Sequence, residues 1–256
     1  MDLLAPSRWR QIDLLSDIHL DVREPDTYAL WSNYLRGTSA DAIFILGDLF
    51  EVWVGDDVLE QPDRFESQCV SDLSAAGSRL DLRIMTGNRD FLMGQQLLAR
   101  CNATTLPDPT TLVFGQQRIV LSHGDALCLD DTDYQSFRRV VRSQSWQQNF
   151  LSKPFSQREA IAREIREQSA SKQHAAPESG HADVDARAAL DLLSAQESAT
   201  LIHGHTHRPG ETQLGSGKKR LVLSDWVANA TPPRADIIRL TLSDDSGLHI
   251  SRTSLV

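Results

Sequence analysis

Five short polar motifs, each placed at the end of an apolar segment, are the feature of this 256-residue chain that most restricts its fold. They are Ser16-Asp17-Ile18-His19, Gly47-Asp48, Gly87-Asn88-Arg89-Asp90, His123-Gly124-Asp125 and His203-Gly204-His205-Thr206-His207. The segments 11–16, 41–46, 80–85, 118–121 and 200–202, at whose ends they lie, have strand patterns. In open α/β sheets, ligands bind beyond the carboxyl ends of the strands. The sequence therefore predicts that the motifs converge on one site.

The segments between the motifs alternate between strand and helix patterns. Apolar residues recur at helical spacing in 28–36, 62–76 and 184–193, and further strands are expected at 112–114, 220–223 and 237–242. Strands that alternate with helices are typical of a layered α/β fold.

Strand patterns vanish between about residues 131 and 183. Helical pairs such as Ile161 and Ile165 recur there, and Pro177–Gly180 has the composition of a loop. We therefore expect a core in two parts, residues 1–130 and 184–256, with an inserted helical segment at 131–183.

Charge and composition limit the possible partners. The net charge of −9 argues against indiscriminate nucleic-acid binding, and we expect no nucleic acid as a partner. Residues 134–173 nevertheless carry eight Lys or Arg against three acids, which predicts either an anionic partner at that place or a solvated helical face. No apolar run approaches the roughly 20 residues of a membrane span, and no apolar signal core is present, so a cytoplasmic location is expected.

The residue types in the motifs are those of a transition-metal site. Asp17 and His19 are one residue apart, as are His205 and His207, so each pair points the same way on an extended segment. Asp48 has two oxygens with which it can bridge two ions. A mixed set of nitrogen and oxygen ligands favours Mn, Fe or Zn over Ca or Mg. The candidate ligands are Asp17, His19, Asp48, Asn88, His123, His205 and His207.

With these motifs, the chain resembles the calcineurin-like metallophosphoesterases, whose pattern D-x-H, GD, GN-[HR]-[DE], H-G and G-H-x-H is present in order. The resemblance implies a four-layer αββα sandwich that holds two Mn²⁺ ions. Asp48 would bridge the two ions. One ion would be held by Asp17, His19, Asp48 and His207, and the other by Asp48, Asn88, His123 and His205.

Longer strings at 45–57, 87–94, 123–138 and 201–209 narrow this resemblance to one branch of the family. Members of that branch hydrolyse a UDP-linked diacylated glucosamine lipid at its α-phosphate in lipid A biosynthesis, giving UMP and 2,3-diacylglucosamine 1-phosphate. Arg89 stands where most relatives have His. An Arg can clamp phosphate oxygens but cannot release a proton at neutral pH, which suits a pyrophosphate substrate. The implied catalytic residues are Asp48, Asn88, Arg89 and His205.

The same resemblance gives the inserted segment the role of a lid over the acyl chains. The implied substrate contacts are Asn88, Arg89, Asp131, Ser169 and His205. The branch also has an Asn and a Lys four and seven residues after this Ser, where the chain has Gln173 and Ala176. Lys172 is the candidate replacement for the missing cation.

A peripheral position on the cytoplasmic face of the inner membrane also follows from the resemblance. No protein partner is predicted. Apolar residues of the lid would line an acyl slot and touch the membrane, or would simply pack the helices onto the core. These residues are Trp146, Phe150, Leu151, Phe155, Ile161 and Ile165.

Two other functions are compatible with parts of the pattern. A two-metal phosphoesterase for a soluble dinucleotide or cyclic nucleotide would need the same ligands, although Arg89 and the lid argue against it. An inactive scaffold would usually have lost metal ligands, and all seven candidates are present here.

Overall fold

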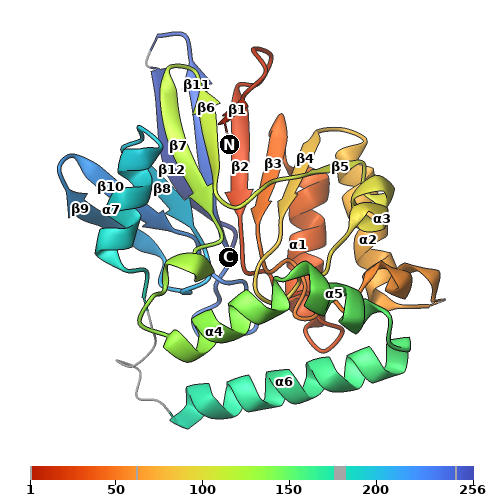
Figure 1. The fold of residues 1–256 in the computed structure, drawn as a ribbon. Coiled ribbons are helices and arrows are strands. Elements are labelled where there is room, and N and C mark those ends of the chain that lie inside the picture. The colour runs from red at the N-terminus through yellow and green to blue at the C-terminus, as the bar shows by residue number, and fades with distance from the viewer. Residues whose placement is uncertain (1, 62, 176–182, 246) are drawn as a thin grey trace.

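The computed structural model describes residues 2–61, 63–175, 183–245 and 247–256, with side chains left out at 170–175. Its strands form two six-stranded sheets, in the orders β1-β6-β7-β8-β10-β9 and β12-β11-β2-β3-β4-β5 (Figure 1). The first sheet contains β1 (Asp2–Leu4), β6 (Thr110–Phe114), β7 (Gln117–Ser122), β8 (Thr200–His203), β10 (Lys218–Val222) and β9 (Gly210–Gly215). The second contains β12 (Gly247–Ser254), β11 (Asp236–Ser243), β2 (Gln11–Leu15), β3 (Ala42–Leu46), β4 (Asp81–Met85) and β5 (Ala103–Thr105).

The helices lie outside the two sheets or in the inserted segment. The core carries α1 (Pro25–Gly37), α2 (Phe65–Gly77), α3 (Gln95–Arg100), α7 (Ala186–Ala195) and two 3₁₀ turns, η1 (Asp56–Glu60) and η2 (Asp125–Leu127). The inserted segment carries α4 (Thr132–Val141), α5 (Gln144–Leu151) and α6 (Phe155–Ala175). None of the described helices has the length and apolarity needed to span a bilayer.

The layering follows from alternation of side chains along strands that are buried on both faces. Phe44 of β3 and Leu121 of β7 belong to the apolar cluster between the sheets. Their neighbours point the opposite way, because successive side chains of a strand alternate between faces. Ile45 packs with residues of α1 and α2, and Val120 packs with residues of α7. The order helix, sheet, sheet, helix confirms the predicted αββα sandwich.

The inserted segment lies across one end of the sandwich. In Figure 1, α4 and α5 cross the lower ends of the sheets, and α6 runs beneath them. Phe150 is buried, and Trp146 stacks on it with ring centroids 4.8 Å apart. Phe155 and Ile161 also pack against the core cluster, so several of the apolar residues hold the helices onto the core. The boundaries at 130 and 184 and the role of a lid stay predictions.

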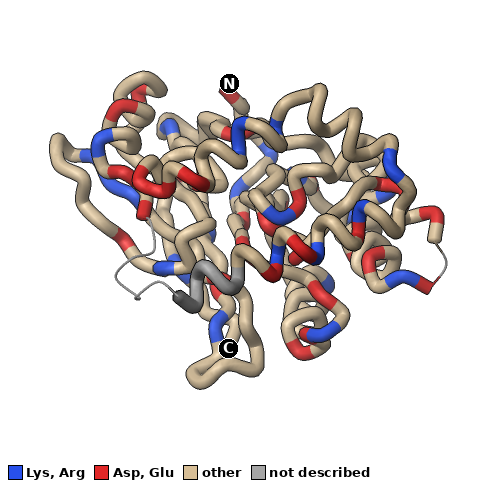
Figure 2. The backbone as a smooth tube through the Cα atoms, turned by 60° about the horizontal axis from the view of Figure 1, so that its bottom comes forward, with Lys and Arg blue, Asp and Glu red and all other residues tan. Residues whose placement is uncertain are grey.

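Half of the cations in this segment are bonded within the molecule. Positive and negative residues are interspersed along the chain in Figure 2. Four of the eight cations bond to groups of the core, so the segment is not simply a solvated basic face. These bonds are Arg138 to Asp125, Arg142 to the Gly87 carbonyl, Arg158 to Asp57 and the Val54 carbonyl, and Arg166 to Glu51.

Candidate metal centre

Parallel strands bring the five motifs together. β2, β3 and β4 run parallel in one sheet, and β7 and β8 run parallel in the other, so the motifs that follow them leave each sheet at one edge. Backbone hydrogen bonds then join neighbouring motifs. The amide of His19 donates to the Asp48 carbonyl at 3.0 Å, and the amide of Gly204 donates to the His123 carbonyl at 3.0 Å.

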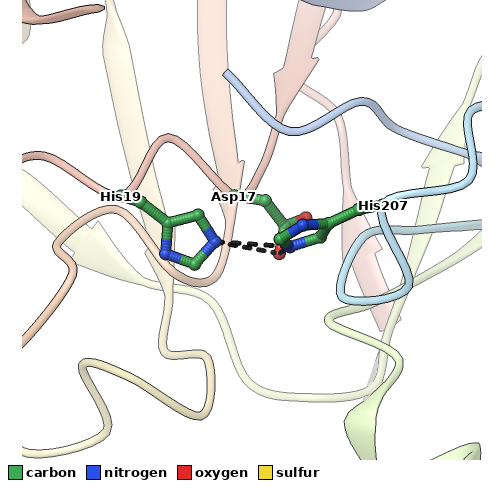
Figure 3. A group of neighbouring side chains, drawn as sticks. All are labelled: Asp17, His19 and His207. Atoms are coloured by element: carbon green, nitrogen blue, oxygen red, sulfur yellow. Dashed lines mark hydrogen bonds and ion pairs between the residues drawn. The ribbon is translucent and has the colours of Figure 1, made fainter. Parts of the chain in front are cut away.

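One cluster contains Asp17, His19 and His207 (Figure 3). The Nε2 atoms of the two histidines are 3.3 Å apart. Asp17 Oδ1 lies 3.3 Å from His207 Nε2 and 4.0 Å from His19 Nε2. Three potential ligand atoms from two distant motifs therefore face one point.

The second cluster adjoins the first. His123 Nε2 lies 3.7 Å from Asp48 Oδ2, and the ligand atoms of Asp17, Asp48 and His123 all lie within 4.8 Å of one another. The Asn88 amide oxygen lies 2.8 Å from both His123 Nε2 and His205 Nδ1. All seven candidate ligands thus meet in two connected groups.

Two features of these atoms fit bound cations. Asp17 Oδ1 is buried and makes no hydrogen bond within the described part of the chain, although His207 Nε2 is 3.3 Å away. The Asn88 oxygen faces two ring nitrogens. With its amide reversed, the Asn88 nitrogen could instead donate to those rings at 2.8 Å and to Asp48 Oδ2 at 3.2 Å. A cation would satisfy the carboxylate, the imidazoles and the amide oxygen together, so the residues present fit a metal centre.

The backbone at the ligands adopts a conformation that non-glycine residues rarely have. Five of the seven candidates have φ in the left-handed region, with values of 53° at Asp17, 51° at His19, 52° at Asp48, 66° at His205 and 52° at His207. Such residues persist only where the surrounding structure enforces them, and they concentrate at functional sites. This clustering is independent of residue type and supports a functional centre.

Two glycines make room for the acidic ligands. A Cβ atom at Gly87 would press on Asp48 Oδ1, and one at Gly204 would press on Asp17 Oδ2 and Ser16 Oγ. The motifs can approach this closely only because these positions carry no side chain.

Hydrogen bonds behind the ligands fix their orientation. His123 Nδ1 lies 2.9 Å from the Leu46 carbonyl, so it carries the proton and leaves Nε2 free to face Asp48 and Asn88. Asp17 Oδ2 accepts the amide of His205 at 2.9 Å. Contacts of this kind set the tautomer and direction of metal ligands.

Asp90, the last residue of its motif, joins two of the loops. It is fully buried, and its carboxylate accepts the amides of Leu49 at 2.7 Å, Phe50 at 3.3 Å and Gly87 at 2.7 Å. Burial, followed by repulsion from Asp48, raises the pKa of Asp90 to about 6. Its role in the site is therefore to hold the loops after β3 and β4 against each other.

Asp125 and Asp225 are further acidic residues next to the ligands. Asp125 accepts Tyr134 Oη–H at 2.5 Å and Arg138 Nε–H at 2.7 Å, which ties α4 to the motif of His123. Asp225 pairs with Arg234 at 2.6 Å and lies 3.7 Å from His207 Nδ1.

This environment shifts the pKa values of two of the histidines in opposite directions. Burial alone would lower the pKa of His123, but attraction to Asp48 and Asp17 raises it to about 9. Burial, followed by repulsion from His123, lowers the pKa of His205 to about 4. A histidine must be neutral at the coordinating nitrogen, so metal binding at His123 has to displace a proton.

The candidate substrate contacts that are not metal ligands lie in different surroundings. Arg89 is 13% exposed, and its Nε lies 3.9 Å from Asp48 Oδ2. Asp131 is exposed and caps α4 by accepting the amide of Tyr134 at 2.9 Å. Ser169 is half-buried on α6, and Lys172 lies on the same helix with its side chain outside the described part. The proposed roles of these four residues stay predictions.

Glu51 belongs to this site, and its role was not predicted from the sequence. Its carboxylate contacts His19, Arg89 and Arg166 at 2.7 to 3.1 Å. The residue lies three positions after Asp48, but no spacing rule assigns it a partner on α6.

The αββα fold and this cluster of acidic and histidine side chains define the class of metallophosphoesterases. The family model described as calcineurin-like phosphoesterase matches residues 10–209, so the chain belongs to this family. Among solved structures, a dimetal phosphatase from Danio rerio is similar over 97% of this chain and 99% of its own, with a TM-score of 0.52 and 16% identity. That likeness concerns the fold alone.

Curated relatives are similar over nearly their whole length. A protein of Aromatoleum aromaticum named UDP-2,3-diacylglucosamine hydrolase is 42% identical over 87% of this chain and 91% of its own. A protein of the same name from Chromobacterium violaceum is 43% identical over 84% of this chain and 90% of its own. Within the calcineurin-like phosphoesterases, the chain is thus a member of the UDP-2,3-diacylglucosamine hydrolase family.

Proposed function

We propose that this protein hydrolyses UDP-2,3-diacylglucosamine at its α-phosphate, giving UMP and 2,3-diacylglucosamine 1-phosphate in lipid A biosynthesis. The observation that carries the proposal is 42% identity to a curated hydrolase of that name across 91% of its length. The meeting of all seven candidate ligands at one place supports it, because a chain that had lost the chemistry would have no reason to keep them.

The cofactor in this proposal is a pair of Mn²⁺ ions. Asp17, His19, Asp48 and His207 would hold one ion, and Asp48, Asn88, His123 and His205 would hold the other. When bound, such ions supply a water that is activated at neutral pH and positive charge for the phosphate oxygens. The nitrogen-rich ligand set supports a transition metal over Mg²⁺.

The side chains of the chain itself would orient the substrate. Arg89, held beside Asp48 and Glu51, would clamp the oxygens of the attacked phosphate. It stays charged and gives up no proton, which suffices here because the leaving group is a phosphate. Asp48, Asn88 and His205 would complete the catalytic set, and the helices α4 to α6 would cover the acyl chains.

Release of UMP tests the proposal directly. The purified protein with Mn²⁺ should release UMP from UDP-2,3-diacylglucosamine and should leave diadenosine tetraphosphate and cyclic nucleotides almost untouched. Excess chelator should lower the rate by about 1000-fold or more, because the metals supply several kcal/mol of transition-state stabilisation. Faster turnover of the soluble nucleotides would instead favour the alternative phosphoesterase.

Arg89→Lys provides a matched variant for the same assay. Lys keeps the charge but loses the bidentate geometry, so kcat/KM should fall by about 10- to 100-fold, with two Mn²⁺ still bound. An unchanged kcat/KM would remove Arg89 from the mechanism.

We further propose that the protein binds the cytoplasmic face of the inner membrane through α4 and the end of α5. Phe137 and Val140 on α4 are 37% and 55% exposed, Leu129 before α4 is 49% exposed, and Leu151 at the end of α5 is 43% exposed. The cation Arg139 is exposed on the same helix. Apolar side chains beside a cation suit the surface of an anionic bilayer.

Co-sedimentation with vesicles tests this second proposal. The protein should bind vesicles that contain phosphatidylglycerol more strongly than vesicles of phosphatidylcholine, and a Phe137→Ser, Val140→Ser variant should lose most of that binding. Leu4→Ser is the control, because Leu4 is 71% exposed but lies on β1, at the opposite end of the molecule (Figure 1). Equal binding by the α4 variant would exclude this surface.

A further inference from the structure

The carboxylate of Glu51 connects three separate parts of the molecule. Glu51 lies on the loop after β3, where its amide donates to the Leu20 carbonyl at 3.2 Å. Oε1 accepts Arg89 Nη1–H at 3.1 Å and two N–H groups of Arg166, from Nε at 2.9 Å and Nη2 at 2.7 Å. Oε2 lies 3.1 Å from His19 Nδ1. A candidate metal ligand, a candidate catalytic residue and the helix α6 thus share one side chain.

The contact with His19 sets the direction of that ring. With Nδ1 turned to Glu51, Nε2 faces His207 Nε2 at 3.3 Å and the carboxylate of Asp17. Here the contact is electrostatic, because His19 Nδ1 makes no hydrogen bond within the described part of the chain. A carboxylate beside the second ring nitrogen of a metal-binding histidine helps to orient the ring and strengthens it as a ligand.

The two arginines lie together on Glu51, beside the metal centre. A single oxygen of Glu51 receives three of their N–H groups, and Arg89 Nε also lies 3.9 Å from Asp48 Oδ2. The side chains of Arg89 and Arg166 are only 13% and 25% exposed, so water screens their charges incompletely. Paired guanidiniums suit a diphosphate, whose adjacent oxygens each accept charge-assisted hydrogen bonds.

The contact with Arg166 also holds the middle of α6. The start of this helix is anchored separately, by Arg158 to Asp57 and by Glu159 to Arg64 at 2.8 Å. Arg166 lies about two turns further along. Its attachment to Glu51 therefore controls residues 163–169 more than residues 155–162.

We propose that Glu51 is a positioning residue that couples α6 to the metal centre, and that it presents Arg166 beside Arg89 as a second guanidinium for a diphosphate. The part that concerns Arg166 rests on the proposed function, since it takes the substrate to be a pyrophosphate. Glu51 itself touches neither substrate nor reacting atoms and acts through its three partners.

Hydrogen exchange and metal titration test the coupling in the full-length protein. In Glu51→Gln, Mn²⁺ affinity at one of the two sites should fall by about 10- to 100-fold. Exchange at residues 163–169 should rise by a similar factor, because bonds to a charged group are lost, while residues 155–162 keep their protection. Arg166→Gln should raise the same exchange and, because it frees Glu51 from one of its partners, should also change Mn²⁺ affinity, by a smaller factor than Glu51→Gln does.

Arg163→Gln is the matched control, because Arg163 is exposed on the same helix. It should behave as the unaltered protein in both measurements. Unchanged Mn²⁺ affinity in Glu51→Gln, or unchanged exchange at 163–169 in Arg166→Gln, would overturn the coupling.

Methylenediphosphonate, which hydrolysis cannot cleave at its bridging carbon, tests the role of Arg166 without the lipid substrate. Its affinity for the Mn²⁺-loaded protein should fall about tenfold or more in Arg166→Gln and recover in part in Arg166→Lys. Equal affinity in Arg166→Gln and Arg163→Gln would exclude the second guanidinium. Failure of the unaltered protein to release UMP from UDP-2,3-diacylglucosamine would refute the proposed function while these binding results still decide the inference.

Discussion

Single residues at this centre are held by their neighbours more than by their own preferences. Asp17, Asp48 and three histidines have left-handed backbones, a conformation that costs roughly 1–3 kcal/mol for each residue. Hydrogen bonds to Asp90, Asp17 and the Leu46 carbonyl stabilise the loops that impose it. The fold of the chain therefore contributes to the geometry of these ligands.

The closest packing in the centre predicts the effect of one methyl group. Gly204→Ala places a Cβ against Asp17 Oδ2 and Ser16 Oγ, so the loop must shift away from a candidate ligand. We expect the free energy of unfolding to fall by about 1–3 kcal/mol and Mn²⁺ affinity to fall with it. Urea denaturation and metal titration measure these changes.

Gly210→Ala is the control for that substitution, because a Cβ there has nothing within 4 Å. It should change the free energy of unfolding by less than about 0.5 kcal/mol. Similar effects at both glycines would show that close approach to Asp17 is not the cause.

At the scale of elements, the inserted helices are tied to the core by buried cations. Arg158, near the start of α6, is 2% exposed, and it bonds to the Val54 carbonyl and to Asp57 of η1. Arg138 bonds to the buried Asp125 from α4. These helices therefore share the stability of the sandwich instead of lying loosely on it.

Loss of the Arg158 anchor should destabilise the protein. Arg158→Ala leaves the Val54 carbonyl without its donor and removes the side chain from a buried position. We expect the free energy of unfolding to fall by about 2–3 kcal/mol, limited because Asp57 is 42% exposed and regains water. Arg163→Ala, an exposed site on α6, should stay within about 0.5 kcal/mol in the same urea titration. Equal losses in the two variants would contradict the anchoring role.

Strongly patterned elements were predictable, and short or edge elements were not. The predicted strand at 41–46 is β3, because five consecutive apolar residues are typical of a strand buried on both faces. By contrast, α3 has only six residues, and β12, at a sheet edge, has only exposed and half-buried residues, so neither has a distinctive pattern. The inserted helices were expected where the structure has α4 to α6, although their exact ends were not.

The part of the site that could be predicted from the sequence is the part in which the chemistry allows only a few residue types. Metal ligands are limited to a few residue types, so Asp17, Asp48 and His123 could be proposed from their motifs. Glu51 could not, because its partner Arg166 lies 115 residues away and only the tertiary structure brings them together. The left-handed backbone at the ligands was not predictable either, since no residue type there requires it.

At the scale of the whole molecule, the centre joins both sheets, so metal binding should stabilise the entire fold. Ligands come from the loops after β2, β3 and β4 in one sheet and after β7 and β8 in the other. At a free Mn²⁺ concentration of 100 times Kd, each site contributes about 2.7 kcal/mol. Removing the metal with a chelator should therefore lower Tm by roughly 5–10 °C per site, as measured by calorimetry. A Tm that does not change with Mn²⁺ would mean that the sheets are not joined in this way.

Anomalous diffraction at the manganese edge, from crystals grown with Mn²⁺, tests the central claim most directly. We predict two peaks roughly 3.5–4 Å apart, both within bonding distance of Asp48, with His19 and His207 at one and His123 and His205 at the other. A single peak, or peaks away from Asp48, would contradict the two-metal centre on which the proposed hydrolysis depends.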